Sequence, residues 1–224
     1  MTIYSGDDVL HLRMETKVDF IRVIEGEFMS SWATIISEID INTDYDDEEI
    51  DFAIAKIRSW YSDVVARCII ISCDDQVASK VLIDENSHVP IKNLLMITPG
   101  IPSDHTLASV FKAKMNALGN GIVAVPVIEI ETDASDGFIH VIHGFNPTGL
   151  PTMEAWVGTP NYFDKPWWHR DDATTIDSPL KEGIDPSVPP KWFFLRMEDL
   201  MGQGSAPVHP KGEFKPKIIP GGKR

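Results

Sequence analysis

Cysteine is scarce in this sequence, and long apolar runs are missing. Only two cysteines, Cys68 and Cys73, occur in 224 residues, too few for a disulfide framework or for the ligand set of a structural zinc site. No apolar run approaches the roughly 20 residues that a membrane-spanning helix needs, and the N-terminal residues lack the basic start and apolar middle of a signal peptide. We therefore expect a soluble, cytoplasmic protein or a component of an assembled particle, without a membrane partner and with buried or half-buried thiols.

Recognisable catalytic signatures are also missing. Residues 99–106, PGIPSDHT, have neither the glycine spacing nor the lysine of a phosphate-binding loop. No serine or cysteine lies in a nucleophile elbow or a triad pattern, and no motif of a known family can be transferred residue by residue. These features favour a protein without enzymatic activity, and no cofactor is indicated except a divalent metal ion.

Basic residues are few in the first two thirds of the chain. The formal net charge is −14, and residues 1–144 contain 24 acidic and 10 basic residues, against 10 of each in residues 145–224. Such a body repels a phosphate backbone. We expect no direct nucleic-acid binding by it, whereas a basic partner, metal ions or mimicry of nucleic acid would suit it.

The N-terminal part predicts two amphipathic helices. Residues 16–40 have apolar side chains at helical spacing, and residues 47–67 repeat the pattern with an acidic first turn and a basic end. About ten residues join them, which favours an antiparallel pair. The apolar positions are Val18, Ile21, Ile24, Phe28, Trp32 and Ile35 in the first segment, and Ile50, Ala53, Ile54, Ile57, Trp60 and Val64 in the second.

Short strands and one central helix follow. Residues 68–72, 80–83 and 94–97 are apolar runs of strand length, and residues 103–118 predict a helix that ends before Gly119. Residues 122–132 and 138–145 then form a predicted β-hairpin. The sequence thus predicts an α+β fold in which the N-terminal helix pair packs on a mainly antiparallel sheet, together with the central helix and the hairpin.

Proline and tryptophan dominate the C-terminal third. Twelve of the 16 prolines occur from Pro147 onward, which excludes long helices and interior strands there. We predict an acidic α+β domain over residues 1–145, an irregular extension over 146–202 that tryptophans anchor on the body, and a basic extended tail over 203–224.

An acidic linker separates the two predicted N-terminal helices. Asp40, Asn42, Asp44 and Asp46 have the alternate-position oxygens of a calcium loop. Tyr45, however, stands where that loop needs glycine. The favoured interpretation is a linker that leads into a negatively charged helix N-terminus.

The central helix and the hairpin contain the first group of candidate site residues. His105 follows Asp104 at the mouth of the helix, where a histidine can act as a general base or a metal ligand. His140 and His143, three apart, point to opposite faces of a strand. Depending on a loop of four or five residues, either His140 faces Glu131 or His143 shares a face with Glu129 and Glu131. Such a cluster can bind a divalent metal ion, or it can decorate the wet face of the sheet.

The segment PWWHRDDATTID contains the second group of candidates. His169, Arg170, Asp171 and Asp172 lie together here, and such residues can hold a metal ion or a phosphate. Alternatively, Arg170 clamps a carboxylate while Trp167 and Trp168 pin the loop to the body.

Three functional hypotheses result. The favoured one is a structural or interaction subunit of a larger assembly, viral or multi-subunit, whose C-terminal arm binds a neighbouring subunit of the same or another protein. The alternatives are a metal-dependent hydrolase or transferase that uses the His, Glu and Asp clusters, and an acidic nucleic-acid mimic that inhibits a basic protein.

Overall fold

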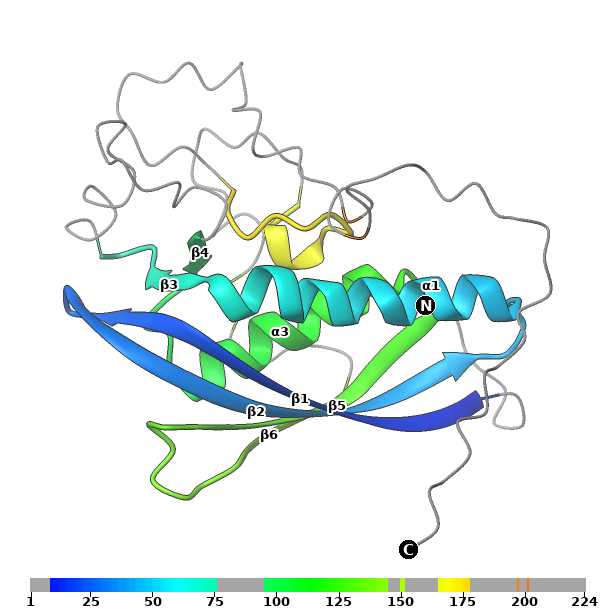
Figure 1. Cartoon of the computed structure of the whole chain (residues 1–224), viewed down its shortest axis with the longest axis horizontal. Helices are drawn as coiled ribbons and strands as arrows, with labels where there is room; N and C mark the ends of the chain where they lie inside the picture. The colour runs from blue at the N-terminus through cyan, green and yellow to red at the C-terminus, as the bar shows by residue number, and fades with distance from the viewer. Residues whose placement is uncertain are drawn as a thin grey trace, which may run out of the picture.

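A long two-stranded hairpin, β1 (Val9–Ile24) and β2 (Glu27–Asn42), lies at the centre of the sheet (Figure 1). The computed structural model describes residues 9–75, 95–144, 150–151, 165–177, 197 and 201. β1 and β2 are antiparallel in one unbroken register. Glu25 and Gly26 both have positive φ, 53° and 82°, which gives the two-residue turn whose twist matches a hairpin.

The helix predicted over residues 16–40 is therefore wrong, and with it the N-terminal helix pair. Its apolar positions fit a helical spacing by coincidence, and three of them, Ile21, Phe28 and Trp32, are 38%, 51% and 42% exposed. The buried positions instead alternate along each strand, and the β-branched residues that dominate the hairpin suit a pleated surface. The alternating side chains on the inner face are Val18, Phe20 and Arg22 of β1 and Ser31, Ala33, Ile35, Ser37, Ile39 and Ile41 of β2.

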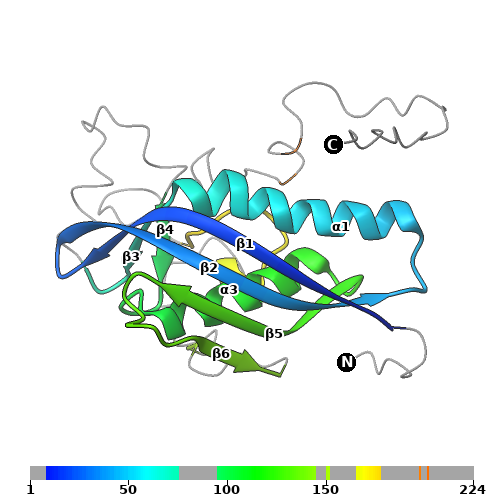
Figure 2. The same ribbon diagram turned by 60° about the horizontal axis from the view of Figure 1, so that its bottom comes forward.

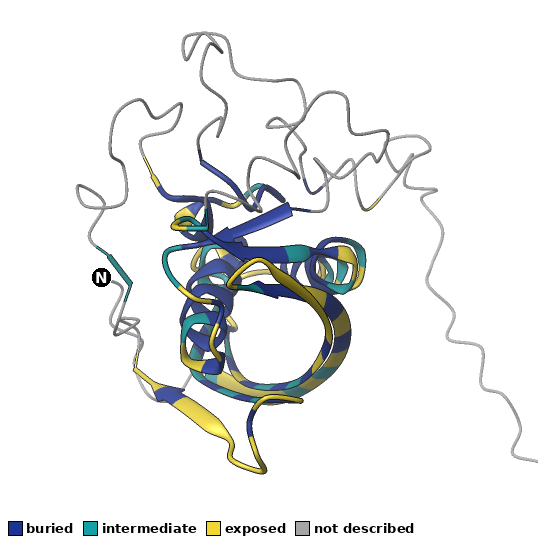
Figure 3. Ribbon diagram, turned by 90° about the vertical axis from the view of Figure 1, so that its left-hand side faces the viewer, coloured by how far each residue is buried: buried dark blue, intermediate teal, exposed yellow. Residues whose placement is uncertain are grey.

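The sheet has six strands in the order β4-β3-β1-β2-β5-β6. β3 (Ile69–Ser72) is parallel to both β1 and β4 (Leu95–Thr98), whereas β5 (Val123–Thr132) is antiparallel to β2 and to β6 (His140–His143). The sheet is therefore mixed, not mainly antiparallel. Seen end on, it curls into a half barrel (Figure 3). The strand predicted at residues 80–83 lies outside the described residues.

Two α-helices are present in the described part of the chain, both on the inner side of the sheet (Figure 1). α1 (Asp47–Ser59) begins where a helix was expected, and Asp46 and Glu49 form its capping box. A π-helical turn, Trp60–Val64, and a short 3₁₀ turn extend it. α3 (Asp104–Gly119) is the predicted central helix, capped by Ser103.

The core lies between these helices and the inner face of the sheet (Figure 2). Trp60, Tyr61 and Phe111 meet edge to face, with ring centroids 5.2, 5.7 and 5.9 Å apart. The Tyr61 hydroxyl donates to the sulfur of Met115 at 3.0 Å, so this polar atom of the cluster is paired inside the protein. The buried indole N–H of Trp60 has no hydrogen-bond partner among the described residues. This packing fixes α1 against α3.

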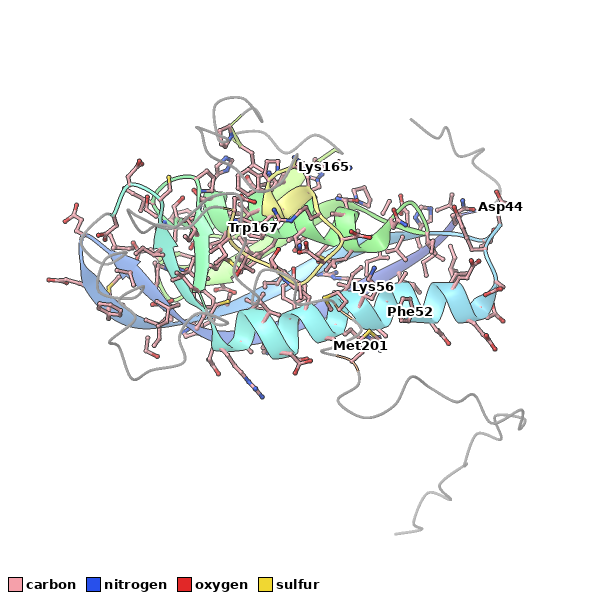
Figure 4. All side chains as sticks on the ribbon, turned by 90° about the horizontal axis from the view of Figure 1, so that it is seen from above. Asp44, Phe52, Lys56, Lys165, Trp167 and Met201 are labelled. Carbon is pink, nitrogen blue, oxygen red and sulfur yellow. The ribbon has the colours of Figure 1, made fainter. Side chains whose placement is uncertain are left out.

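Part of the predicted C-terminal extension packs on this body. Trp167 and Trp168 are fully buried, and Figure 4 shows Trp167 over α3. The tail at 203–224 and the greater part of 146–202 lie outside the described residues. No helix in the described segments is long and apolar enough to cross a membrane.

Candidate functional site

The edge of β1 that faces away from β2 is open over most of its length. β3 pairs with β1 only from Ile21 to Val23, so residues 9–20 have no second strand beside them among the described strands. The N–H of Ile21 donates to the carbonyl of Cys68 at 3.0 Å, which places the backbone polar groups of Ile21 on the β3 side. Backbone direction alternates along a strand, and the register with β2 is unbroken. Residues 11, 13, 15, 17 and 19 therefore present their N–H and C=O groups at the open edge.

Charged side chains line this edge on the outer face of the sheet. They are His11, Arg13, Glu15, Lys17 and Asp19, all exposed. Lys17 lies 3.4 Å from Glu15, and His11 and Arg13 pair with the half-buried Asp40 and Glu129. One side of every pair is well exposed, so each ion pair stabilises the fold little. On the inner face, Leu10 and Leu12 are 52% and 42% exposed. The edge thus combines free backbone groups, charges of both signs and an apolar strip.

On the same side of the sheet, two strands beyond β1, the chain covers the edge strand β4 with its own C-terminal segment. The N–H of Ile97 in β4 donates to the carbonyl of Thr175 at 3.0 Å, and the Thr175 hydroxyl donates to the carbonyl of Leu95. The indole N–H of Trp167 donates to the carbonyl of Ile97 at 2.8 Å. An uncovered edge strand is a template for pairing with another chain. The β4 edge is protected in this way, whereas no segment among the described residues protects the β1 edge.

Arg170 holds the segment that covers β4, residues 165–177, together by hydrogen bonds. Its guanidinium donates to Asp177 at 2.6 Å, to Asp172 at 3.1 Å and to the carbonyls of Lys165 and Ile176, both at 3.1 Å. Nη2, which donates to Ile176, also donates to the hydroxyl of Thr174. Arg170 and Asp172 are therefore engaged with one another and with the loop, which leaves this arginine no N–H group for a phosphate.

All four candidates of this segment, His169, Arg170, Asp171 and Asp172, line a cavity of about 450 Å³ next to the end of α3. His169 and Asp171 line it together with Lys165, which Figure 4 shows next to Trp167. Burial, and then the Lys165 charge, lower the pKa of His169, so its neutral form is favoured. Among the described residues, no three His, Cys, Asp or Glu side chains gather in a way that could hold a metal ion.

Two buried lysines of α3 connect the helix to the elements around it. The Lys114 ammonium donates to the carbonyls of Trp167 and Arg170, both at 2.9 Å, and burial lowers its pKa to about 7. Lys112 donates to the carbonyls of Pro126 in β5 at 2.5 Å and Ile142 in β6 at 3.0 Å. Burial also lowers its pKa, to about 8. The sequence interpretation missed both residues, although a helix with apolar neighbours around each lysine offered a signal.

A buried carboxylate joins the start of α3 to the sheet. Asp104 accepts from Arg22 at 3.3 Å, from the Thr132 hydroxyl at 2.7 Å and from the Ser135 hydroxyl at 2.5 Å. His140 lies 4.0 Å away. Asp104, a catalytic candidate, thus meets His140, a metal candidate, but its oxygens already accept three hydrogen bonds that hold β1, α3 and the end of β5 together. His105 is exposed on the first turn of α3.

The remaining candidates lie on the outer face of the β5–β6 hairpin. Glu129 lies opposite Val141, and His143 lies opposite Val127, so His143 shares the outer face with Glu129 and Glu131. His140 pairs with Ile130 and lies on the inner face. The two histidines are separated as their spacing predicts, and the structure brings no metal-binding set together here. The connecting loop, residues 133–139, is longer than either length considered.

The acidic linker before α1 caps the helix. Asp46 accepts from the N–H of Glu49 at 2.8 Å, and Asn42 accepts from the N–H of Asp44 at 2.9 Å. Asp40 pairs with His11 at 2.7 Å. Three of the four residues with calcium-loop spacing therefore use their side-chain oxygens within the fold.

Cys68 is a buried free thiol, and Cys73 is a half-buried one.

Comparisons with known proteins find a distant structural similarity. No family model matches the chain, and no curated protein matches it. Two solved structures of Plasmodium vivax 6-pyruvoyltetrahydropterin synthase, one of them a catalytic-residue mutant, are similar at TM-scores of 0.33 and 0.32 with 11% and 10% identity. Each comparison covers 61% of this chain and 98% of the other. We draw no functional conclusion from likenesses at this level.

Proposed function

We propose that the protein is an interaction subunit of a larger assembly and that the open edge of β1 is part of its contact surface. The observation that carries the proposal is the row of backbone donors and acceptors on the odd-numbered residues from 11 to 19, which have no second strand beside them among the described residues. Addition of a strand to such an edge supplies hydrogen bonds at every second residue. The exposed Leu10 and Leu12 would then be covered as well.

The difference between the covered edge of β4 and the open edge of β1 supports this proposal. The segment around Thr175 and Trp167 hydrogen-bonds to β4, so a part of the C-terminal third covers this edge strand. The β1 edge is longer, and no described strand lies beside it over residues 9–20. A protein that functions alone gains from blunting such an edge, whereas a subunit of an assembly can use it.

The C-terminal arm is the second part of the proposed contact. The segment from residue 203 to the end has five basic residues and one acidic residue, and the body is acidic. An arm of this composition cannot build a core of its own and is complementary in charge to the body of a neighbouring subunit.

Native mass measurement tests this function directly. We expect the full chain to exceed the mass of one copy, 25.0 kDa, in native mass spectrometry and light scattering. A chain that ends at Gly202 should lose mass beyond the deleted residues, because it loses the arm contact. A full chain that stays monomeric at all concentrations tested would contradict the proposal.

A further inference from the structure

The charges along the open edge of β1 form a pattern that is complementary to itself when reversed. Arg13, Glu15, Lys17 and Asp19 alternate in sign and share the outer face. We propose that β1 pairs with β1 of a second copy of this chain, antiparallel and with two-fold symmetry about Thr16. This inference rests on the proposed function and names one of its partners, a second copy.

The backbone geometry of the edge fits this arrangement. Antiparallel pairing about Thr16 sets Arg13 opposite Asp19 and Glu15 opposite Lys17, and the two-fold axis repeats each pair. All four residues have the same strand parity as Ile21, whose N–H points toward the β3 side. They therefore form the hydrogen-bonded pairs of the new ladder, in which both residues exchange N–H and C=O contacts.

Other registers are less favourable electrostatically. A centre at Glu15 sets this carboxylate against its own copy and Arg13 against Lys17. A centre at Lys17 sets the ammonium against its copy and Glu15 against Asp19. A centre at Met14 keeps one kind of complementary pair, Arg13 with Glu15. Like charges directly opposite each other destabilise a strand pair, so Thr16 is the centre that makes every charged pair from residue 13 to residue 19 complementary.

The same register also brings apolar side chains together on the inner face. Pairing about Thr16 places Met14 opposite Val18 and Leu12 opposite Phe20 of the second copy. Leu12 is 42% exposed in one copy, so this contact covers apolar surface. The pairing ends at Phe20, since β3 occupies the edge from Ile21 onward. The seam would join two curled sheets into one continuous sheet, because each is hydrogen-bonded to the other along β1.

Charge reversal tests the register. Glu15→Lys and Lys17→Glu each turn two attractive pairs of the seam into repulsive ones. We expect each variant to weaken self-association by about ten-fold or more in sedimentation velocity. Glu27→Lys and Arg58→Glu are matched controls, because they make the same charge changes at exposed positions outside the proposed contact, and their association should stay at the wild-type level.

Recombining the reversed charges gives the sharper measurement. A mixture of Glu15→Lys and Lys17→Glu chains sets lysine against glutamate in both seam pairs, so the two variants should associate with each other although neither associates with itself. The double variant Glu15→Lys/Lys17→Glu should self-associate again. Single variants that keep the wild-type association, or a mixture that stays monomeric, would overturn the proposed pairing.

Disulfide cross-linking locates the two-fold centre of the strand pair independently of charge. Thr16 would lie opposite its own copy in a non-hydrogen-bonded pair, where Cα atoms are about 4.5 Å apart, within the range of a disulfide. Thr16→Cys should therefore form a covalent dimer under mild oxidation, with loss of two thiol protons and two electrons to the added oxidant. Lys17→Cys, which lies opposite residue 15, should not. Equal cross-linking at both positions would contradict the centre.

The outcomes separate this inference from the proposed function. An oligomer that loses mass on truncation at Gly202 but ignores charge reversal at residues 15 and 17 would overturn the β1 pairing and leave the subunit role standing. An oligomer that responds to charge reversal but loses no further mass on truncation would support the β1 pairing and contradict the arm contact. A monomeric full chain would overturn both.

Discussion

Single residues inside α3 make the stability of this protein depend on pH. The pKa of Lys114 is about 7 in the folded protein, against an ordinary value of 10.5, because burial disfavours the ammonium form. Between these two pH values the unfolded chain holds a proton that the folded chain has released. Stability from this group therefore rises with pH across the window and is lost below pH 7, where both states are protonated.

Replacing Lys114 with methionine should remove this dependence. We expect the unfolding free energy of wild type relative to Lys114→Met to increase between pH 7 and pH 10, with a slope of up to about 1.4 kcal/mol per pH unit. Urea unfolding at pH 7, 8.5 and 10 measures it. Lys165→Met, at an exposed lysine outside the proposed β1 contact, is the control and should leave the slope unchanged. Parallel curves for Lys114→Met and wild type would show that the ammonium is not the titrating group.

Asp104 is the residue whose loss should weaken the fold most directly. Asp104→Asn removes the charge that faces the buried Arg22 guanidinium, which is 2% exposed. Breaking one side of a buried ion pair costs about 3–5 kcal/mol, so the urea midpoint should fall markedly. Asp136→Asn in the neighbouring turn is the control, since this exposed residue has φ 50°, which asparagine tolerates well. Midpoints shifted equally in both variants would contradict the assigned role.

At this scale the sequence located residues but not their partners. Asp104 and Arg170 were singled out from their loops, and the structure shows each of them engaged in hydrogen bonds within the fold. Arg22 gave no signal, because its partner lies 82 positions away. Lys112 and Lys114 were missed for a related reason, since the carbonyls that accept from them belong to other elements.

At the scale of elements, the direction of backbone groups in β1 can be tested with proline. The N–H of Glu15 points to the open edge, whereas the N–H of Thr16 points to β2. Proline is tolerated on an edge strand where no ladder hydrogen bond is lost. Glu15→Pro should therefore keep a folded monomer that no longer self-associates, and Thr16→Pro should unfold the hairpin. Circular dichroism and sedimentation measure both, and equal unfolding by the two substitutions would refute the assignment of the edge.

The elements with strong local signals were predictable, and the longest hairpin was not. α1 and α3 begin at capping residues, Asp46 and Ser103, which local sequence reveals. The hairpin of β1 and β2 contains apolar residues that satisfy two periods at once, and its turn residue Gly26 lies inside the span predicted as a helix. Sheet pairing decided between the periods, because β2 lies between β1 and β5. Such long-range contacts leave no mark on local spacing.

At the scale of the whole molecule, charge gives the proposed pairing its specificity. Each copy has a formal net charge of −14, so two copies repel each other at a distance. Only a contact with local complementarity can bring them together, and the alternating charges of β1 supply one. The division of charge along the chain was visible in the sequence. The position of the open edge was not, since it depends on how far β3 extends along β1.

The tight turn at Glu25 and Gly26 has a consequence for the order in which the chain acquires its structure. β1 and β2 are adjacent in sequence, so the hairpin needs only a two-residue loop to close, whereas the pairing of β2 with β5 joins residues such as Ala33 and Thr132. Short loops close faster and at a lower entropic cost than long ones. In pulse-labelling hydrogen exchange during refolding, we expect the even-numbered amides of β1 to gain protection before those of β5. The hairpin would then act as the template on which both ends of the sheet assemble.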